Sequence, residues 1–268
     1  MKDLCSQYGF FEKPFTRELS IDKRFRLPWM EEAVQSLLAT VQDRQSAALI
    51  APAGTGKSTI LRALCSQLPD ARFRLTYLKV TSLGRRDMCR EISYALGCQA
   101  SGTLPLLHRR IQEHFLQLTD QQSLRPVLII DESHELKADV LGMLKLLTNF
   151  EMDSRLVVSL VLCGQTPLKT LLRRDELQDI TMRLMHYATL RPLSRAESRQ
   201  YIEHRCRIAG AKEIPFDDAA FDAIFEFARG NLRANDCLSL KSLELAHQKD
   251  CRVVGTEHVI EARQLLWP

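Results

Sequence analysis

The chain has 268 residues, of which 45% are hydrophobic and 26% charged, and its formal net charge is +4. No apolar run approaches the ~18 residues that span a bilayer, the N-terminal stretch lacks a signal-peptide pattern, and the eight cysteines form no Cys-x-x-Cys pair. From these features we expect no transmembrane segment, no secretory leader and no clustered-cysteine zinc or redox site, and we expect a cytoplasmic protein without membrane contact. The positive charge permits binding to a polyanion but does not require it.

Short apolar runs alternate with helical patterns through the first 192 residues. After an N-terminal arm, residues 29–42 have helical periodicity. Further helices are predicted at 58–68, 85–97 and 104–118, and strands at 47–51, 73–81, 126–131, 156–164 and, more briefly, 186–190. Strands that alternate with helices indicate an α/β fold, here with a five-stranded parallel sheet covered on both faces.

From residue 194 onward the pattern contains only helices. Ser194 and Glu197 form a capping box at the start of the first. Phe221, Ile224, Phe225 and Ala228 make one apolar face of the second, and two more helices are predicted at about 232–248 and 256–266. We therefore divide the chain into an arm and first helix (1–45), an α/β core (46–192) and a small helical lid (193–268).

The stretch Ala-Pro-Ala-Gly-Thr-Gly-Lys-Ser at 51–58 matches the phosphate-binding P-loop pattern except that Ala51 replaces the first glycine. Glycines let the loop turn its amides toward phosphate oxygens, and the following helix adds its N-terminal partial positive charge. Lys57 can reach the β and γ phosphates, and the Ser58 hydroxyl can bind Mg²⁺. The alternative is an ordinary glycine-rich strand-to-helix turn. The predicted nucleotide-binding residues are Pro52, Ala53, Gly54, Thr55, Gly56, Lys57, Ser58 and Thr59.

Two carboxylates follow the buried run Val-Leu-Ile-Ile, at the strand end where open α/β sheets bind ligands. Asp131 is placed to hold Mg²⁺ through water, and Glu132 to polarise an attacking water as a general base. An ordinary acidic strand end is the alternative. With the loop at 51–58, this pair makes nucleotide hydrolysis the leading chemistry.

A third polar signal comes after the fourth predicted strand, in Leu-Val-Leu-Cys-Gly-Gln. Gln165 would emerge beside Asp131 and Glu132 if the third and fourth strands are neighbours in the sheet. Its amide could then orient the water or touch the γ-phosphate, although a plain loop glutamine remains the alternative.

The order of these motifs resembles that of an AAA+ ATPase. Within that class the chain is similar to the secretion ATPases of the ExeA/GspA kind and the transposition ATPases of the TniB/TnsC/MuB kind. The resemblance is carried by YGFFEKPF, APAGTGKST, VLIIDESHEL, LVLCGQTPL, RLMHYATLRPLSRAESRQYIEHR and GNLRANDCLSL. It implies ATP and Mg²⁺ as cofactors and a ring or helical assembly of identical subunits.

The resemblance also implies roles for residues far from the P-loop. Arg233, in Gly-Asn-Leu-Arg, resembles the sensor 2 arginine that reaches the nucleotide phosphates. Arg183 occupies the place of an arginine finger offered to a neighbouring subunit, and Arg173 and Arg174 are rival candidates. The arm around residues 11–15 would line the adenine pocket by analogy.

Two functions of different classes fit this resemblance. A secretion ATPase is expected to continue into a membrane span, which this sequence lacks, so we favour an ATP-switched, largely sequence-independent adaptor on duplex DNA that recruits a transposase. The alternative is a protein-assembly or secretion ATPase without DNA binding, and a replication-type loader is a minor third. Basic and hydroxyl side chains suited to phosphate contacts, or else forming a plain solvated face, are Lys79, Thr81, Ser82, Arg85, Arg86 and Lys137.

Overall fold

The structure is a computed structural model that describes residues 3–267 and divides into two compact units. One unit contains the chain up to Leu27, the short stretch Ala53–Gly56, and the chain from Arg191 onward. The other contains Pro28–Pro52 and Lys57–Leu190. We call them the helical unit and the sheet unit, and we describe each by itself.

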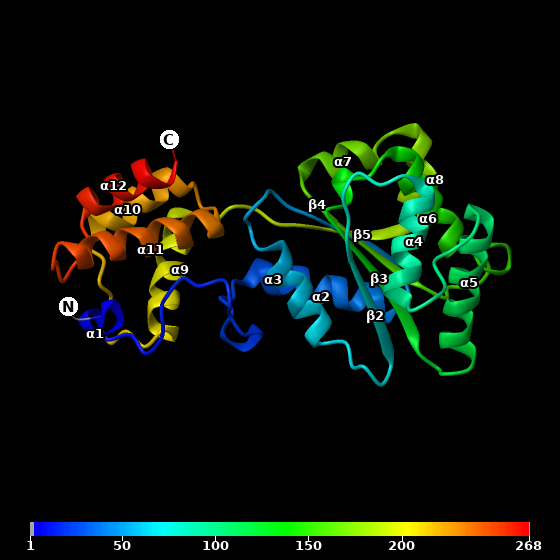
Figure 1. Ribbon diagram of the computed structural model, residues 1–268, viewed down its shortest axis with the longest axis horizontal. Coiled ribbons are helices and arrows are strands. Elements are labelled where there is room, and N and C mark those ends of the chain that lie inside the picture. Colours follow the sequence, from blue (N-terminus) through cyan, green and yellow to red (C-terminus); the bar gives the residue numbers. More distant parts are fainter. Residues whose placement is uncertain (1–2, 268) are drawn as a thin grey trace. The chain divides into compact units, whose positions relative to one another are not determined.

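The sheet unit is built on five parallel strands in the order β2-β3-β4-β1-β5 (Figure 1). Their bounds are β1 Ser46–Ile50, β2 Phe73–Lys79, β3 Arg125–Asp131, β4 Ser159–Gly164 and β5 Leu184–Thr189. The five-stranded parallel sheet predicted from the sequence is therefore confirmed. It runs from edge strand β2 through β3, β4 and β1 to edge strand β5.

The burial of each strand follows from its place in that order. Every residue of β1 and β4 is buried, as are all but the first of β3, so these central strands read as continuous apolar runs. The edge strands β2 and β5 alternate buried and exposed residues instead. Ala48, Ile50, Leu128 and Ile130 share one large core with side chains of α4 (Arg85–Leu96), α5 (Leu104–Asp120) and α6 (Ala138–Thr148).

Predicted boundaries differ from the observed ones mainly where an extended segment has no ladder partner. The β3–β4 ladder begins at Val127 and Ser159, so residues 156–158 of the predicted fourth strand lie outside it. The helices α2 (Pro28–Gln42) and α3 (Lys57–Ser66) match their predictions closely. Helix α6 and five short elements are not among the helices that the pattern predicts: η2 Ser133–Glu135, η3 Glu151–Asp153, α7 Thr166–Leu172, η4 Asp175–Leu177 and α8 Gln178–Thr181.

The helical unit combines both ends of the described chain. Its helices are α9 Arg195–Ile208, α10 Asp218–Ala228, α11 Leu232–Gln248 and α12 Thr256–Leu266, with α1 Leu4–Tyr8 and η1 Ile21–Lys23 in the arm. The capping box is confirmed, because the Ser194 hydroxyl accepts from the Glu197 amide and the Glu197 carboxylate accepts from the Ser194 amide. No helix among residues 3–267 is both long and apolar enough to cross a membrane.

The arm packs on the C-terminal helices through aromatic residues. The Tyr8 hydroxyl donates to the Cys251 carbonyl oxygen at 2.8 Å, and the ring of Phe15 meets that of Phe216 edge-on with centroids 6.2 Å apart. Both contacts lie within the helical unit, so the arm contributes to the core of this unit.

Candidate active site

The carboxyl ends of β1, β3 and β4 lie at one edge of the sheet, because these strands are parallel neighbours. Lys57 follows β1, Asp131 ends β3 and Gln165 follows β4 directly. The role predicted for Gln165 requires that the strand before it be a neighbour of the strand that ends at Asp131. Strands β4 and β3 are such neighbours. Ligands of open α/β sheets bind at this edge.

The P-loop backbone needs glycine at two positions. Gly54 and Gly56 have φ angles of 73° and 99°, a region that disfavours residues with a Cβ atom. Ala51 has a negative φ, and its amide donates to the Gly164 carbonyl oxygen at 3.1 Å, so it ends β1 without strain. The missing first glycine of the motif therefore leaves the loop's conformation open to phosphate binding.

Lys57 is buried at the start of α3. Its ammonium donates to the carbonyl oxygens of Ala51 and Pro52, each at 3.3 Å. The charge is thus held on the loop by two weak neutral acceptors, which a phosphate oxygen can replace with stronger charge-assisted bonds. Ser58, the next residue, is exposed.

The Asp131 carboxylate is buried and held from two sides. Its Oδ1 accepts from the Glu132 amide and its Oδ2 from the Tyr77 hydroxyl, both at 2.8 Å. Burial, together with the adjacent Asp131, holds the pKa of the Tyr77 hydroxyl well above its usual range, so this group remains a donor. A carboxylate fixed in this way suits a hard divalent cation, which prefers oxygen ligands.

Glu132 stands at a sharp turn between β3 and η2. Its φ of 57° and ψ of 32° place it in the left-handed region, which few residues other than glycine, Asn and Asp adopt. The Ser133 hydroxyl donates to the Ile130 carbonyl oxygen at 2.7 Å and closes the turn. Backbone in such a sparsely populated region is concentrated at functional sites.

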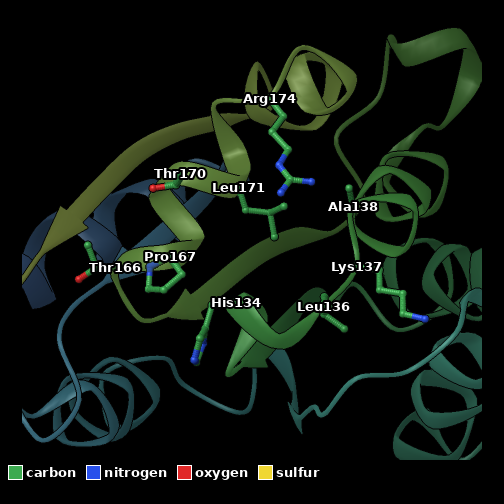
Figure 2. Close-up of a pocket in the computed structure, with 9 residues that line it drawn as sticks. All are labelled: His134, Leu136, Lys137, Ala138, Thr166, Pro167, Thr170, Leu171 and Arg174. Carbon is green, nitrogen blue, oxygen red and sulfur yellow. The ribbon is translucent and has the colours of Figure 1, made fainter.

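A groove of about 650 Å³ adjoins this turn (Figure 2). Leu136 and Lys137 line one side of it, and Pro167 and Leu171 of α7 line the other, with Arg174 beyond them. His134 also lines the groove, so the groove reaches the segment that carries Glu132.

Comparison with known proteins agrees with this geometry. Residues 40–172 match the family described as AAA domain. The match covers the P-loop and the carboxylate pair. Residues 40–172 are thus similar to an AAA domain, and the fold is that of an AAA+ P-loop ATPase. The sheet unit carries nearly all of the matched segment.

General secretion pathway protein A of Aeromonas hydrophila is a curated relative of this chain. The two are 30% identical over 226 residues, which cover 83% of this chain and 41% of that protein. The chain thus spans well under half the length of this relative.

Solved structures share its fold. Cdc6p of Pyrobaculum aerophilum aligns with a TM-score of 0.76 and 18% identity over 94% of this chain and 70% of that one. The Aeropyrum pernix ORC1 protein, solved in complex with DNA, aligns with a TM-score of 0.69 and 17% identity over 91% and 67%. The Thermotoga maritima RuvB Holliday junction branch migration motor aligns with a TM-score of 0.63 and 19% identity over 94% of this chain and 73% of that one. At these identities the likeness shows the fold alone.

In the helical unit, the start of α11 meets the tip of the P-loop. The Asn231 side-chain amide donates to the Ala53 carbonyl oxygen at 2.7 Å, and the Arg233 backbone amide donates to the Gly54 carbonyl oxygen at 3.3 Å. The predicted sensor arginine therefore follows a residue that contacts the loop, while its own side chain is exposed.

Arg183 is already paired within its own chain. Its guanidinium lies 2.5 Å from the Asp153 carboxylate, and its side chain is only 17% exposed. Asp153 belongs to η3, where Glu151, Met152 and Asp153 all have positive φ angles. An arginine finger at this position would have to leave Asp153 before it reached another subunit.

The predicted DNA-contacting residues follow two neighbouring strands. Lys79 ends β2 in register with Asp131, and Thr81, Ser82, Arg85 and Arg86 follow it to the first turn of α4, all exposed. Lys137 caps the start of α6 and lines the groove. Among residues 3–267, no carboxylate lies within 4 Å of the charged groups of Lys79, Arg85, Arg86 or Lys137.

Three residues of the candidate site were not predicted from the sequence: Tyr77, His134 and Asn231. Tyr77 and His134 contact the carboxylate pair, and Asn231 contacts the P-loop tip. Asn231 stands inside the Gly-Asn-Leu-Arg motif, so the motif could have pointed to it. Nothing in the spacing of Tyr77 indicates that its hydroxyl would reach Asp131, because that depends on the register of β2 and β3.

Proposed function

We propose that this chain is an AAA ATPase that assembles with ATP on the backbone of duplex DNA and recruits or activates a transposase. The observation that carries this proposal is the exposed basic segment after β2, with Lys137 after the neighbouring strand β3. Arg85 and Arg86 stand in the first turn of α4, where the helix dipole disfavours cations. Contacts with DNA phosphates would explain cations at this position, and such contacts do not read the base sequence.

In this proposal each residue of the site has its own role in ATP hydrolysis. Lys57 would bind the β and γ phosphates, Ser58 and Asp131 would hold Mg²⁺, and Glu132 would take a proton from the attacking water. Gln165 orients that water. Arg233, and Arg183 supplied by a neighbouring subunit, offset the charge that develops on the phosphoryl oxygens.

Assembly would turn weak DNA contacts into strong binding. One subunit with a net charge of +4 makes few phosphate contacts, but a ring or helix multiplies them along the duplex. Affinity should then rise with ATP and with DNA length, and fall steeply with salt. DNA sequence should matter little.

Fluorescence anisotropy with random-sequence duplexes tests the proposal. Binding is measured across a salt series with an ATP analogue, with ADP and without nucleotide. We expect tight binding with the analogue only. The variant Arg85→Ala/Arg86→Ala should weaken it for all sequences and reduce the salt slope by about two.

The matched control removes two arginines from α5, as Arg109→Ala/Arg110→Ala, and should leave DNA binding within about twofold of the parent. Equal and negligible binding in all three nucleotide states would contradict the DNA proposal. In that case the second candidate takes its place.

That second candidate is a protein-assembly ATPase of the secretion kind. It is favoured by the 30% identity to general secretion pathway protein A over 83% of this chain. A gene for a transposase beside the gene for this chain would favour the first candidate over the second.

A further inference from the structure

His134 sits between the proposed general base and the loop that follows β4. It is the middle residue of η2, and its side chain is only 7% exposed. Figure 2 shows it near the end of a strand and below Pro167, which begins the opposite side of the groove.

One ring nitrogen of His134 faces two groups. The Gln165 backbone amide donates to Nδ1 at 3.4 Å, and Nδ1 also lies 3.5 Å from the Glu132 carboxylate. The other nitrogen, Nε2, lies 3.3 Å from the Glu135 carboxylate. The ring therefore connects the catalytic turn to the loop at Gln165.

Hydrogen-bond chemistry decides which tautomer this arrangement requires. A neutral imidazole has one N–H group and one lone pair, so an Nδ1 that accepts from Gln165 carries no proton. The proton then lies on Nε2, toward Glu135. Glu132 consequently meets a lone pair rather than a donor, so no hydrogen bond from His134 occupies its carboxylate.

The close approach is built into the backbone at the end of β4. A Cβ atom at Gly164 would lie 3.2 Å from the His134 backbone nitrogen and 2.9 Å from a side-chain carbon of Leu168. Glycine at this position therefore allows η2 and the residue before Gln165 to come together.

We propose that His134 is a positioning residue that ties Glu132 to the loop at Gln165. This rests on the proposed role of Glu132 as general base. While the Gln165 amide occupies Nδ1, the turn is fixed and Glu132 is free to act. If the loop withdraws, the imidazole can adopt its other tautomer, with the proton on Nδ1 instead of Nε2. Nδ1 then donates a hydrogen bond to the Glu132 carboxylate and blocks the base. Hydrolysis thus follows the position of the loop that would sense the γ-phosphate.

Three substitutions separate this role from mere packing. Asparagine places an amide oxygen near the position of Nδ1, glutamine places its polar atoms near Nε2, and leucine has none. We expect His134→Leu and His134→Gln to lower kcat about tenfold or more, with KM and nucleotide affinity nearly unchanged, and His134→Asn to recover most of kcat. Single-turnover phosphate release, titration with a fluorescent ATP analogue and thermal unfolding supply the readouts.

A double variant checks that His134 acts through Glu132. In a Glu132→Gln background, the residual rate should not fall further when His134→Leu is added. A His134→Leu protein with the parent's kcat, or a His134→Asn protein no better than His134→Gln, would overturn the proposal. If Glu132→Gln alone hydrolysed ATP normally, the role of Glu132 would fail instead, so the two failures are distinguishable.

Discussion

Lys57 and Glu132 act on different parts of the reaction, so their loss should have different signatures. Glu132→Gln keeps the size of the side chain but removes the base, and we expect near-normal ATP binding with hydrolysis reduced about 100-fold or more. Lys57→Ala removes charge-assisted bonds to phosphate, and we expect ATP binding about 10- to 100-fold weaker. Phosphate release and titration with a fluorescent ATP analogue measure the two effects. Undiminished hydrolysis by Glu132→Gln would remove Glu132 from its role.

The surroundings of Asp236 also allow a quantitative prediction. It lies on α11, where it accepts from the Tyr201 hydroxyl at 2.8 Å and lies 3.5 Å from the Arg205 guanidinium. Burial raises the pKa of Asp236 to about 6, although Arg205 and the bond from Tyr201 oppose the shift. The folded chain therefore binds this proton more readily than the unfolded chain does.

The sign of the effect on stability follows directly. A raised pKa gives a contribution to the free energy of unfolding that is present below about pH 4 and lost as the pH rises through about 6. Asp236→Asn has no proton to lose, yet it still accepts from Tyr201. Relative to the parent, it should gain about 2 kcal/mol between pH 4 and pH 7 in urea unfolding followed by circular dichroism. A difference in the free energy of unfolding between Asp236→Asn and the parent that stayed constant from pH 4 to pH 7 would mean that Asp236 is not the titrating group.

At the scale of elements, the turn between α10 and α11 depends on one glycine. Gly230 has a φ of 73°, and a Cβ atom there would lie 2.0 Å from the Leu193 carbonyl oxygen. Gly230 and Leu193 are also joined by a backbone hydrogen bond of 2.9 Å. The start of α11, with Asn231 and Arg233, is thereby fixed to the segment that leads into α9.

Gly230→Ala should therefore destabilise the helical unit by at least about 3 kcal/mol, since a backbone clash adds to the left-handed conformation. Gly9→Ala is the matched control in the same unit: its φ is 71°, but nothing lies within 4 Å of the added Cβ. It should cost only about 1 kcal/mol. Urea unfolding measures both, and equal losses would show that conformation alone, without the clash, accounts for the effect.

The elements themselves could be predicted because their signals are local. The buried strands are short apolar runs bounded by loop residues, and α10 has its apolar residues on one face. The weaker predictions fall where pairing decides the outcome, as at residues 156–158, or where the whole segment is apolar, as in α6. The P-loop and the carboxylate pair are also local signals. By contrast, the contact of Tyr77 with Asp131 and the pairing of Arg183 with Asp153 join residues 54 and 30 positions apart, which no short window can reveal.

At the scale of the whole molecule, the proposed arginine finger links catalysis to assembly. Arg183→Ala should still bind ATP but hydrolyse it about 1,000-fold more slowly, because charge on the phosphoryl oxygens loses its partner. Mixing it with Glu132→Gln protein should restore part of the activity, since a mixed interface can pair an intact finger with an intact base. Phosphate release from the mixture, with size measured by mass photometry, provides the test.

Asp153→Asn is the companion variant, because it weakens the ion pair that holds Arg183 in its own chain. It should hydrolyse ATP at least as fast as the parent at equal protein concentration. An Arg183→Ala protein that assembles and hydrolyses normally would place the finger elsewhere, and Arg173 and Arg174 would be tested next.

The strand order of the sheet also determines when each strand can pair during synthesis on the ribosome. Within residues 3–267, strand β1, which leads into the P-loop, pairs with β4 and β5 and with no other strand. Ser46 at its start bonds Leu160 of β4, which is 114 residues later in the chain. At ordinary rates of synthesis, β1 must wait between about 6 and 20 seconds for its first strand partner. During that interval a strand that is fully buried in the folded chain stands unpaired. The segment that leads into the P-loop is therefore exposed to aggregation while the chain is being made, and a chaperone would protect it.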